Sequence, residues 1–506
     1  MDLGKKHGDP TITLKLDLKK AYDSVDWDFI QKVLQGHGFS DKWIKWTNVC
    51  INSPKFSVLC NGVPAGSFSA SRGIRQGCPL SPLLFAFVTE YFSNLMETAI
   101  VEGKIKVSKA VSQKNMKISH TFYADDLMVV KADIPTVKAI DELLQQFKEA
   151  TGLQVNKEKN SVIFSKSVRG RRRISNILRF QTENFPFKYL GLPLSNNNLR
   201  TGDFRMLVDK INGRLTHWNT INLSIAGRIE LLRSVLYSYL YHWVFGFKIP
   251  WEVKVDLERR FKCFLWSGKS DVKKISQLKW SQVTLPISEG GFDLRKIQDI
   301  DVAAKMTLCW DFVQKKNKTW IQWLHARYLQ RVSFWNVVPK LTDSPIWKQI
   351  LGVRQLILQN LSSELEMGYS SGSDIIGWKT GSFSLKAAWN SCRFINPTLN
   401  WCDLCWKHCR PRIAVVVGII LHNKNLSLIN LQKRDITITA ICHNCTRNVD
   451  SNDHLFCTCN YAQQVWHEIF SLLHIDNPHC ISLMQMVEWF GQQTTTDSKF
   501  LPNQKC

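Results

Sequence analysis

Three aspartates stand in sequence contexts that suit ligands of divalent cations. Asp17 ends a short β-rich run at residues 12–18. Asp125 and Asp126 lie side by side between the two apolar half-strands of residues 118–132. Neighbouring antiparallel strands are about 4.8 Å apart, so a strand end and a hairpin tip can bring carboxylates together. Such a set could hold two Mg²⁺ ions that clamp a 3′-hydroxyl and a triphosphate.

The Asp pair has a simpler explanation, because Asp is common in turns. Here, however, the flanking residues are apolar and would bury the hairpin. Burying two adjacent acids without a cation is costly. We therefore interpret the pair as metal ligands. The apolar neighbours are Phe122, Tyr123, Leu127, Met128 and Val129.

A second metal site is indicated near the C-terminus, where ten of the fifteen Cys fall from Cys392 onward. The spacing C-x2-C-x8-H-x4-C can close a tetrahedral zinc site of three thiolates and one imidazole. Its residues are Cys442, Cys445, His454 and Cys459, with Cys457 as an alternative to Cys459. The other interpretation is a cluster of reduced, buried Cys.

Composition favours a nucleic-acid partner. The chain has 66 Lys and Arg against 42 Asp and Glu, a net charge of +24, together with 19 Trp and 27 Phe. Basic charge attracts phosphate, and flat aromatic rings can stack on bases. Alternatively, the aromatics fill cores and the Lys and Arg residues solubilise the surface. The sequence suggests neither a membrane span nor a secretion signal, so we expect an intracellular protein with no membrane partner.

The three aspartates require a sheet to position them. An antiparallel sheet with packed helices would do so, and the mixed order of patterns predicts this α+β class. From about residue 195 onward helical patterns predominate. The predicted strands are 12–18 and 161–165, the hairpin is 118–132, and the helices are 79–100 and 135–150.

Three segments resemble motifs A, B and C of reverse transcriptases, in the same order. They are KLDLKKAYDSV at 15–25, RGIRQGCPLSPLLFAF at 72–87 and FYADDL at 122–127. Further along, 152–165 resembles motif D and 187–195 the primer-grip hairpin. The thumb of plant LINE-type, non-LTR retrotransposon reverse transcriptases is closely similar to 218–250, and the zinc-binding module that follows those enzymes is similar to 454–466.

This resemblance implies a right-hand polymerase palm, an α-helical thumb and connecting region, and a small Cys/His zinc-binding module. The family places a fingers subdomain upstream of motif A. We therefore expect an N-terminally truncated chain that lacks the fingers and extends primers poorly or not at all by itself. The expected domains are 1–194 (palm, motifs A to E), 195–250 (thumb), 251–373 (connecting region), 374–480 (zinc-binding module) and 481–506 (polar tail).

The resemblance also assigns roles to individual residues. Asp17 and Asp125 would ligate two catalytic Mg²⁺ ions, with Asp126 completing the triad. Tyr22 would discriminate against a ribose 2′-hydroxyl, although it could also be only a packed aromatic. Lys159 would assist pyrophosphate departure. The implied nucleotide site comprises Leu18, Tyr22, Gln76, Gly77 and Lys159, and the implied primer site comprises Tyr189, Leu190 and Gly191.

In the C-terminal module the resemblance implies one structural Zn²⁺, held by the Cys442, Cys445, His454 and Cys459 set. A second cluster falls where the family has an apolar and basic helix. We expect its Cys to be core residues rather than ligands. These residues are Cys402, Cys405, His408 and Cys409.

The resulting hypothesis is an RNA-directed DNA polymerase that uses an RNA template, a DNA primer and deoxynucleoside triphosphates, with a nuclear location. One alternative is a catalytically inactive nucleic-acid-binding remnant of such an element. Another is an intron-maturase-like splicing protein, since those proteins share the palm. The thumb-like and zinc-like motifs favour the LINE relationship over the maturase.

Overall fold

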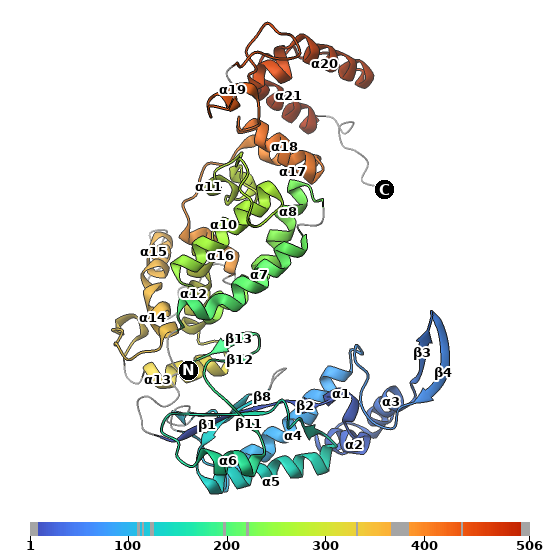
Figure 1. Cartoon of the computed structure of the whole chain (residues 1–506), viewed down its shortest axis with the longest axis vertical. Helices are drawn as coiled ribbons and strands as arrows, with labels where there is room; N and C mark the ends of the chain where they lie inside the picture. Colours follow the sequence, from blue (N-terminus) through green and yellow to red (C-terminus); the bar gives the residue numbers. More distant parts are fainter. Residues whose placement is uncertain are drawn as a thin grey trace. The chain divides into compact units, whose positions relative to one another are not determined.

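A computed structural model describes the course of the chain over 9–108, 112–113, 116–121, 126–195, 199–218, 222–329, 332–365, 384–436 and 439–496. The chain divides into two compact units (Figure 1). Unit 1 comprises residues 1–198 and 317–337, and unit 2 comprises residues 199–316 and 338–506. The mixture of strands and helices confirms the predicted α+β class. No helix in the described part of the chain is long and apolar enough to cross a membrane.

Unit 1 is built on a five-stranded sheet with the order β11-β10-β1-β8-β7. Its central strand, β1, is a β-branched run, TITLKL, in which Ile12, Leu14 and Leu16 are buried. β1 pairs antiparallel with both β10 and β8. The strands are β1 (Thr11–Leu16), β7 (His120–Thr121), β8 (Asp126–Lys131), β10 (Ser161–Phe164) and β11 (Gln181–Glu183).

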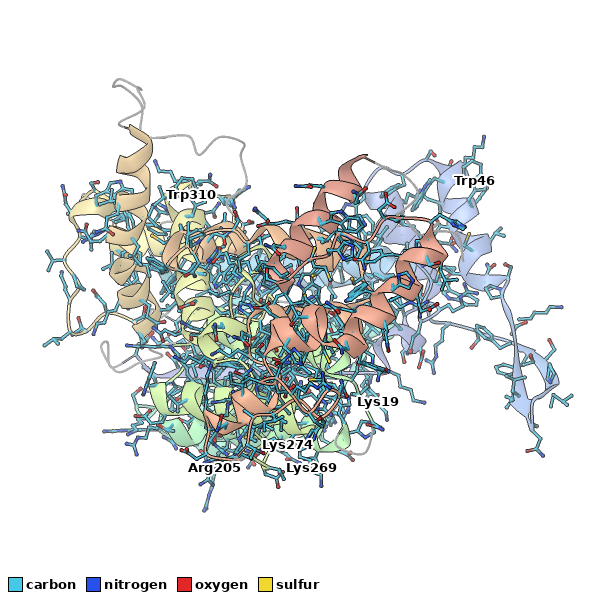
Figure 2. All side chains as sticks on the ribbon, turned by 90° about the horizontal axis from the view of Figure 1, so that it is seen from above. Lys19, Trp46, Arg205, Lys269, Lys274 and Trp310 are labelled. Atoms are coloured by element: carbon cyan, nitrogen blue, oxygen red, sulfur yellow. The ribbon has the colours of Figure 1, made fainter. Side chains whose placement is uncertain are left out.

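Helices α4, α5 and α6 lie along one face of this sheet (Figure 1). The buried side chains of β1 share one core with Phe92 and Met96 of α4 and Ile140 of α5. Trp46 of α3 is instead 59% exposed and lies at the surface (Figure 2). The helices of unit 1 are α1 (Ala21–Ser24), α2 (Trp27–Gly36), α3 (Asp41–Asn52), α4 (Ser81–Val101), α5 (Ile134–Thr151), α6 (Arg171–Leu178) and α13 (Thr319–Tyr328).

Four two-stranded ribbons accompany the sheet of unit 1. The ribbon β2–β9 continues directly from β1, and β12–β13 forms a tight hairpin. The strands are β2 (Leu18–Lys19) with β9 (Gln154–Val155), β3 (Lys55–Cys60) with β4 (Val63–Ser69), β5 (Ser112–Gln113) with β6 (Met116–Lys117), and β12 (Phe187–Tyr189) with β13 (Leu192–Leu194).

Unit 2 is helical in its described residues, apart from one isolated β-bridge between Ile441 and Val449. A π-helical turn, Leu232–Leu236, joins two of its helices. The helices are α7 (Arg205–Trp218), α8 (Ile225–Leu231), α9 (Tyr237–Gly246), α10 (Trp251–Ser267), α11 (Trp280–Val283), α12 (Ile297–Val313), α14 (Pro345–Gly352), α15 (Arg354–Leu365), α16 (Leu385–Cys392), α17 (Asn400–His408), α18 (Pro411–Leu421), α19 (Leu428–Gln432), α20 (Asn460–Leu473) and α21 (Leu483–Thr496).

Unit 2 has two features that the sequence did not predict, a buried Lys at the end of α9 and a helix within the segment 481–506. A buried ammonium, Lys305, donates to the carbonyls of Val244 and Phe247 and so caps the C-terminal end of α9. The segment expected as a polar tail, 481–506, contains α21, whose Met486 is buried. The first half of α21 is mostly apolar, and the rings of Trp489 and Phe490 have centroids 5.5 and 6.5 Å from that of Phe470 in α20.

Candidate active site and metal centre

Asp17 lies where the chain leaves the five-stranded sheet and enters the β2–β9 ribbon. Its main-chain N–H donates to Oδ1 of Asn160 at 2.7 Å, and its carbonyl accepts the N–H of Asn156, also at 2.7 Å. Its side chain is 31% exposed, with the ammonium of Lys159 3.9 Å from Oδ2. The carboxylate is therefore accessible while its backbone is held in place.

The strand register brings the start of β8 beside the end of β1. Leu16 pairs with Asp126, and Lys15 pairs with Leu127. Asp125 lies outside the described residues, as does the side chain of Asp126. Convergence of the three carboxylates therefore stays a prediction.

Tyr22 lines an open pocket of roughly 570 Å³, within the ~300–1,000 Å³ range of small-ligand sites. Its ring stacks on Phe85 of α4, with the centroids 4.9 Å apart and the planes at 18°. The predicted nucleotide-site residues Gln76 and Gly77 line the same pocket. The complete lining is Tyr22, Gln76, Gly77, Cys78, Pro79 and Pro82.

Cys78, Pro79 and Pro82 were not among the predicted site residues, although all three belong to the motif B segment that we had singled out. The Leu80 backbone hydrogen bond and, more weakly, the positive charge of Arg75 lower the pKa of the Cys78 thiol. The pocket thus combines an aromatic ring, an amide and a polarisable thiol.

The loop that forms this pocket is bonded directly to the segment after Asp17. Gly73 donates its N–H to the carbonyl of Val25 at 2.8 Å, and the indole of Trp27 donates to the carbonyl of Gly73 at 2.6 Å. Ile74 donates to the carbonyl of Tyr22 at 2.7 Å. Gly73 has φ +90°, and an added Cβ would lie 2.7 Å from the carbonyl carbon of Asp23. Only glycine fits this close approach.

The predicted primer-site residues form the turn of the β12–β13 hairpin. Leu190 and Gly191 have φ +48° and +79°, as the two central residues of a type I′ turn require. The hydroxyl groups of Tyr189 and Thr121 are 3.4 Å apart. The ammonium of Lys15 donates to the carbonyl of Lys188 at 3.2 Å. This hairpin is thereby fixed beside β7 and β1.

Two basic residues of unit 2, Arg228 and Arg233, lie within 218–250, the segment that resembles a thumb. Both bond to main-chain carbonyls. Arg228 donates to Leu265 at 3.1 Å and Arg233 to Phe292 at 2.6 Å. Burial lowers the pKa of Arg228. These contacts hold the α8 region against the rest of unit 2.

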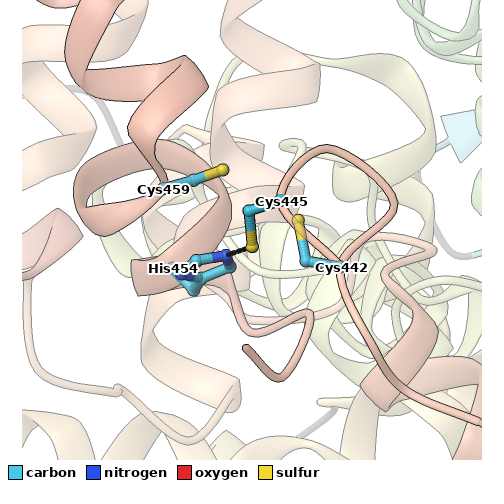
Figure 3. A group of neighbouring side chains, drawn as sticks. All are labelled: Cys442, Cys445, His454 and Cys459. Atoms are coloured by element: carbon cyan, nitrogen blue, oxygen red, sulfur yellow. Dashed lines mark hydrogen bonds between the residues drawn. The ribbon is translucent and has the colours of Figure 1, made fainter. Parts of the chain in front are cut away.

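The structure brings Cys442, Cys445, His454 and Cys459 together (Figure 3). Their ligand atoms all lie within 4.8 Å of one another, and Sγ of Cys445 is 3.2 Å from Nε2 of His454. Three thiols and one imidazole at this separation fit a tetrahedral Zn²⁺. Cys457 is buried but does not belong to this group, so Cys459 is the better candidate ligand.

The thiols of this group have different electrostatic surroundings. Burial raises the pKa of Cys442. The main-chain hydrogen bonds of Arg447 and Asn448 lower the pKa of Cys445 to about 6. By contrast, burial raises the pKa of Cys457 to about 11. The thiolate form that binds metal is therefore favoured inside the group at Cys445 and disfavoured at Cys457.

Two residues of the second Cys cluster lie in the core of the module, whereas Cys409 is half-buried and His408 is exposed. Cys402 and Cys405 of α17 are buried together with Trp401. Burial raises the pKa of Cys402 to about 11 and that of Cys405 to about 12. Among the described residues, no His, Cys, Asp or Glu side chains at this position lie close enough together to hold a metal ion. The interpretation of Cys402 and Cys405 as core residues is therefore supported.

Two protein families match parts of the chain. The family described as reverse transcriptase (RNA-dependent DNA polymerase) matches residues 2–194. The family described as zinc-binding in reverse transcriptase matches residues 383–466. The first match contains the Asp17 site and its pocket, and the second contains the Cys/His group.

Two curated proteins are similar over longer stretches. The transposon TX1 uncharacterized 149 kDa protein of Xenopus laevis is 26% identical over 281 residues, which cover 55% of this chain and 21% of the relative. The Pol polyprotein from the type-2 retrotransposable element R2DM of Drosophila melanogaster is 26% identical over 251 residues, covering 47% and 22%. The chain thus spans about a fifth of each relative. A telomerase structure from Candida albicans, in complex with a fragment of telomeric RNA, has a TM-score of 0.32 at 12% identity, covering 65% of this chain and 51% of that one.

Proposed function

Since the chain carries a reverse transcriptase domain at residues 2–194 and the zinc-binding module of reverse transcriptases at 383–466, we propose that it is part of a non-LTR retrotransposon RNA-directed DNA polymerase. The observation that carries this proposal is the neighbourhood of Asp17. The carboxylate of Asp17 is accessible at a strand end, beside the start of the strand that contains Asp126. The ammonium of Lys159 lies close to the same carboxylate.

The donor set suits Mg²⁺, which binds oxygen and needs only a few protein carboxylates. Asp17, Asp125 and Asp126 would hold two such ions in this proposal. When bound, the ions would stabilise the charge on the attacking and leaving oxygens of nucleotidyl transfer. The backbone bonds of Asp17 fix its position, which limits the reorganisation needed during the reaction.

The pocket is proposed to hold the incoming deoxynucleoside triphosphate. Tyr22, stacked on Phe85, would lie against the sugar and exclude a 2′-hydroxyl. The positive φ of Gly77 allows the backbone of the loop to approach the nucleotide closely. Leu18 and Gln76 would complete the contacts. Lys159 would donate a proton to the departing pyrophosphate, a role that its position beside Asp17 supports.

The partners in this proposal are an RNA template and a DNA primer. The β12–β13 turn, with Tyr189, Leu190 and Gly191, would contact the primer backbone. The net charge of +24 supports binding to phosphate. One structural Zn²⁺ would be held by Cys442, Cys445, His454 and Cys459, and it would contribute folding energy to the module. A nuclear location also belongs to the proposal, and imaging of a tagged chain would test it.

Primer extension with Mg²⁺ tests this function. The full chain is incubated with an RNA template, a labelled DNA primer and deoxynucleotides, and Asp17→Asn is compared with Asp28→Asn, an exposed Asp on α2. We expect extension that Asp17→Asn abolishes and Asp28→Asn leaves intact. Extension by a folded, zinc-loaded chain that persists in Asp17→Asn, or that Asp28→Asn abolishes equally, would contradict the proposal.

A further inference from the structure

The main chain at Asp17 lies at a break in the sheet. β1 ends at Leu16 and β2 begins at Leu18, and the two strands pair with different partners. Main-chain groups at such a break need hydrogen bonds from elsewhere. The 156–160 loop provides both, through the N–H of Asn156 and Oδ1 of Asn160.

Asn160 is itself held firmly. It has no exposed surface, its N–H donates to the carbonyl of Asn156 at 2.9 Å, and its carbonyl accepts the N–H of Gln181 at 3.3 Å. Its amide oxygen therefore has little freedom to move away from Asp17. The contact of 2.7 Å is as short as a good N–H to oxygen bond becomes.

The other end of the same amide is unusual. Nδ2 of Asn160 is buried and has no hydrogen-bond partner among the residues that the structure describes. A buried donor without a partner costs roughly 1–3 kcal/mol, which is more than one ordinary hydrogen bond returns. As a purely structural device for one turn, this amide would be a net loss. This cost is explained if the amide oxygen of Asn160 has a functional role in holding the backbone of Asp17.

The 156–160 loop also carries Lys159, whose ammonium approaches the Asp17 carboxylate. One loop thus contacts the N–H, the carbonyl and the side chain of the same residue. We propose that Asn160 is a positioning residue: its amide oxygen fixes the backbone of Asp17 and thereby the direction in which the carboxylate meets a divalent cation. This inference rests on the proposed function, in which Asp17 is a metal ligand.

Substitutions at position 160 distinguish the effect of losing the amide acceptor from the effect of changing the side chain that fills this site. Asn160→Leu keeps the number and branching of the side-chain heavy atoms but removes the acceptor. Asn160→Asp keeps an acceptor oxygen toward the Asp17 N–H and replaces only the unpartnered Nδ2. Lys157→Ala is the matched control, since Lys157 is an exposed residue of the same loop. Asp17→Asn removes the proposed ligand itself.

The measurement is the affinity of the full, zinc-loaded chain for Mn²⁺, followed by the loss of the free-ion signal in electron paramagnetic resonance. Zinc content and the unfolding midpoint are recorded for each variant. We expect Asn160→Leu to weaken Mn²⁺ binding roughly 10–100-fold, as the loss of groups that orient metal ligands does. Asn160→Asp should stay within about threefold of the wild type or bind more tightly, and Lys157→Ala should not differ.

Wild-type affinity in Asn160→Leu would overturn the inference, and so would a loss in folded Asn160→Asp as large as that in Asn160→Leu. If Asn160→Leu does not fold, Asn160→Ser takes its place, because its shorter side chain withdraws the acceptor. Failure of the proposed function would give a different result from failure of this inference. In that case Asp17→Asn would bind Mn²⁺ as well as the wild type, or the wild type would bind none outside its zinc site.

Discussion

A metal-binding carboxylate must stay accessible while its backbone is held, and Asp17 meets both conditions. Its side chain remains partly exposed, and both of its main-chain groups bond to one loop. The family resemblance placed both Asp17 and Lys159 in the predicted site, and the structure brings the Lys159 ammonium to 3.9 Å from the Asp17 carboxylate. Asn160 was not among the predicted site residues, because nothing in the sequence places its amide beside Asp17. The contact appears only when β9 and β10 are folded against β1.

Tyr22 gives the first prediction at the residue scale. Tyr22→Val should raise ribonucleotide incorporation relative to deoxynucleotide incorporation by roughly tenfold or more, because the ring that would exclude a 2′-hydroxyl is removed. Tyr22→Phe keeps the ring and its stacking on Phe85, so its selectivity should stay near that of the wild type. Single-nucleotide extension assays measure the ratio. Unchanged selectivity in active Tyr22→Val would contradict the assigned role.

The zinc ligands give the second prediction. Cys442→Ser/Cys445→Ser should lose its zinc, and the C-terminal module should become sensitive to proteolysis, because structural zinc contributes folding energy directly. Cys409→Ser should keep one zinc per chain. Elemental analysis of protein purified without chelator provides the count. Retention of zinc in the double variant would place the site elsewhere.

At the scale of elements, the loop before α4 depends on one glycine. Gly73 and Gly77 both have positive φ, but only at Gly73 would a Cβ meet backbone. Gly73→Ala should therefore lower the free energy of unfolding by more than about 1 kcal/mol, and Gly77→Ala should lower it less. Urea unfolding of both variants measures the difference. Equal losses would show that the contact between Gly73 and the Asp23 backbone does not determine the loop.

The C-terminal end of α9 gives a prediction about pH. Burial lowers the pKa of Lys305 to about 8, so between pH 8 and 10.5 the unfolded chain binds more protons at this residue than the folded chain does. The folded state therefore gains stability at Lys305 as pH rises through this window. The free energy of unfolding of the wild type should rise relative to Lys305→Met, by on the order of 1 kcal/mol from pH 7.5 to 9.5. A difference between the two that does not change with pH would contradict this.

Element boundaries were less predictable than element types. The apolar patterns predicted the β1 strand and α5 because each has a clear face and, for α5, a glycine at its end. The helical patterns after residue 195 did not reveal the π-helical turn Leu232–Leu236, because such a turn depends on packing that periodicity does not record. α21 was missed because the apolar residues of its first half, 483–490, were grouped with the polar residues that follow them. The domain boundaries within the helical half stay a proposal.

On the scale of the whole molecule, excess positive charge is distributed over both units. Exposed basic side chains include Lys19 in unit 1 and Arg205, Lys269 and Lys274 in unit 2 (Figure 2). The affinity of the chain for single-stranded RNA should therefore fall steeply with salt, as condensed counterions are released on binding. Filter binding between about 50 and 200 mM salt measures the slope. Affinity that does not depend on salt would contradict binding through phosphate.

The proposed activity of this chain is the addition of deoxynucleotides to a DNA primer under the direction of RNA. Its sharpest test is extension of a primer on RNA templates that differ only in the first templating base, with one deoxynucleotide supplied at a time. We expect weak addition of the complementary deoxynucleotide on each template, and its loss in Asp17→Asn. Addition that ignores the templating base, or that persists undiminished in Asp17→Asn, would contradict it.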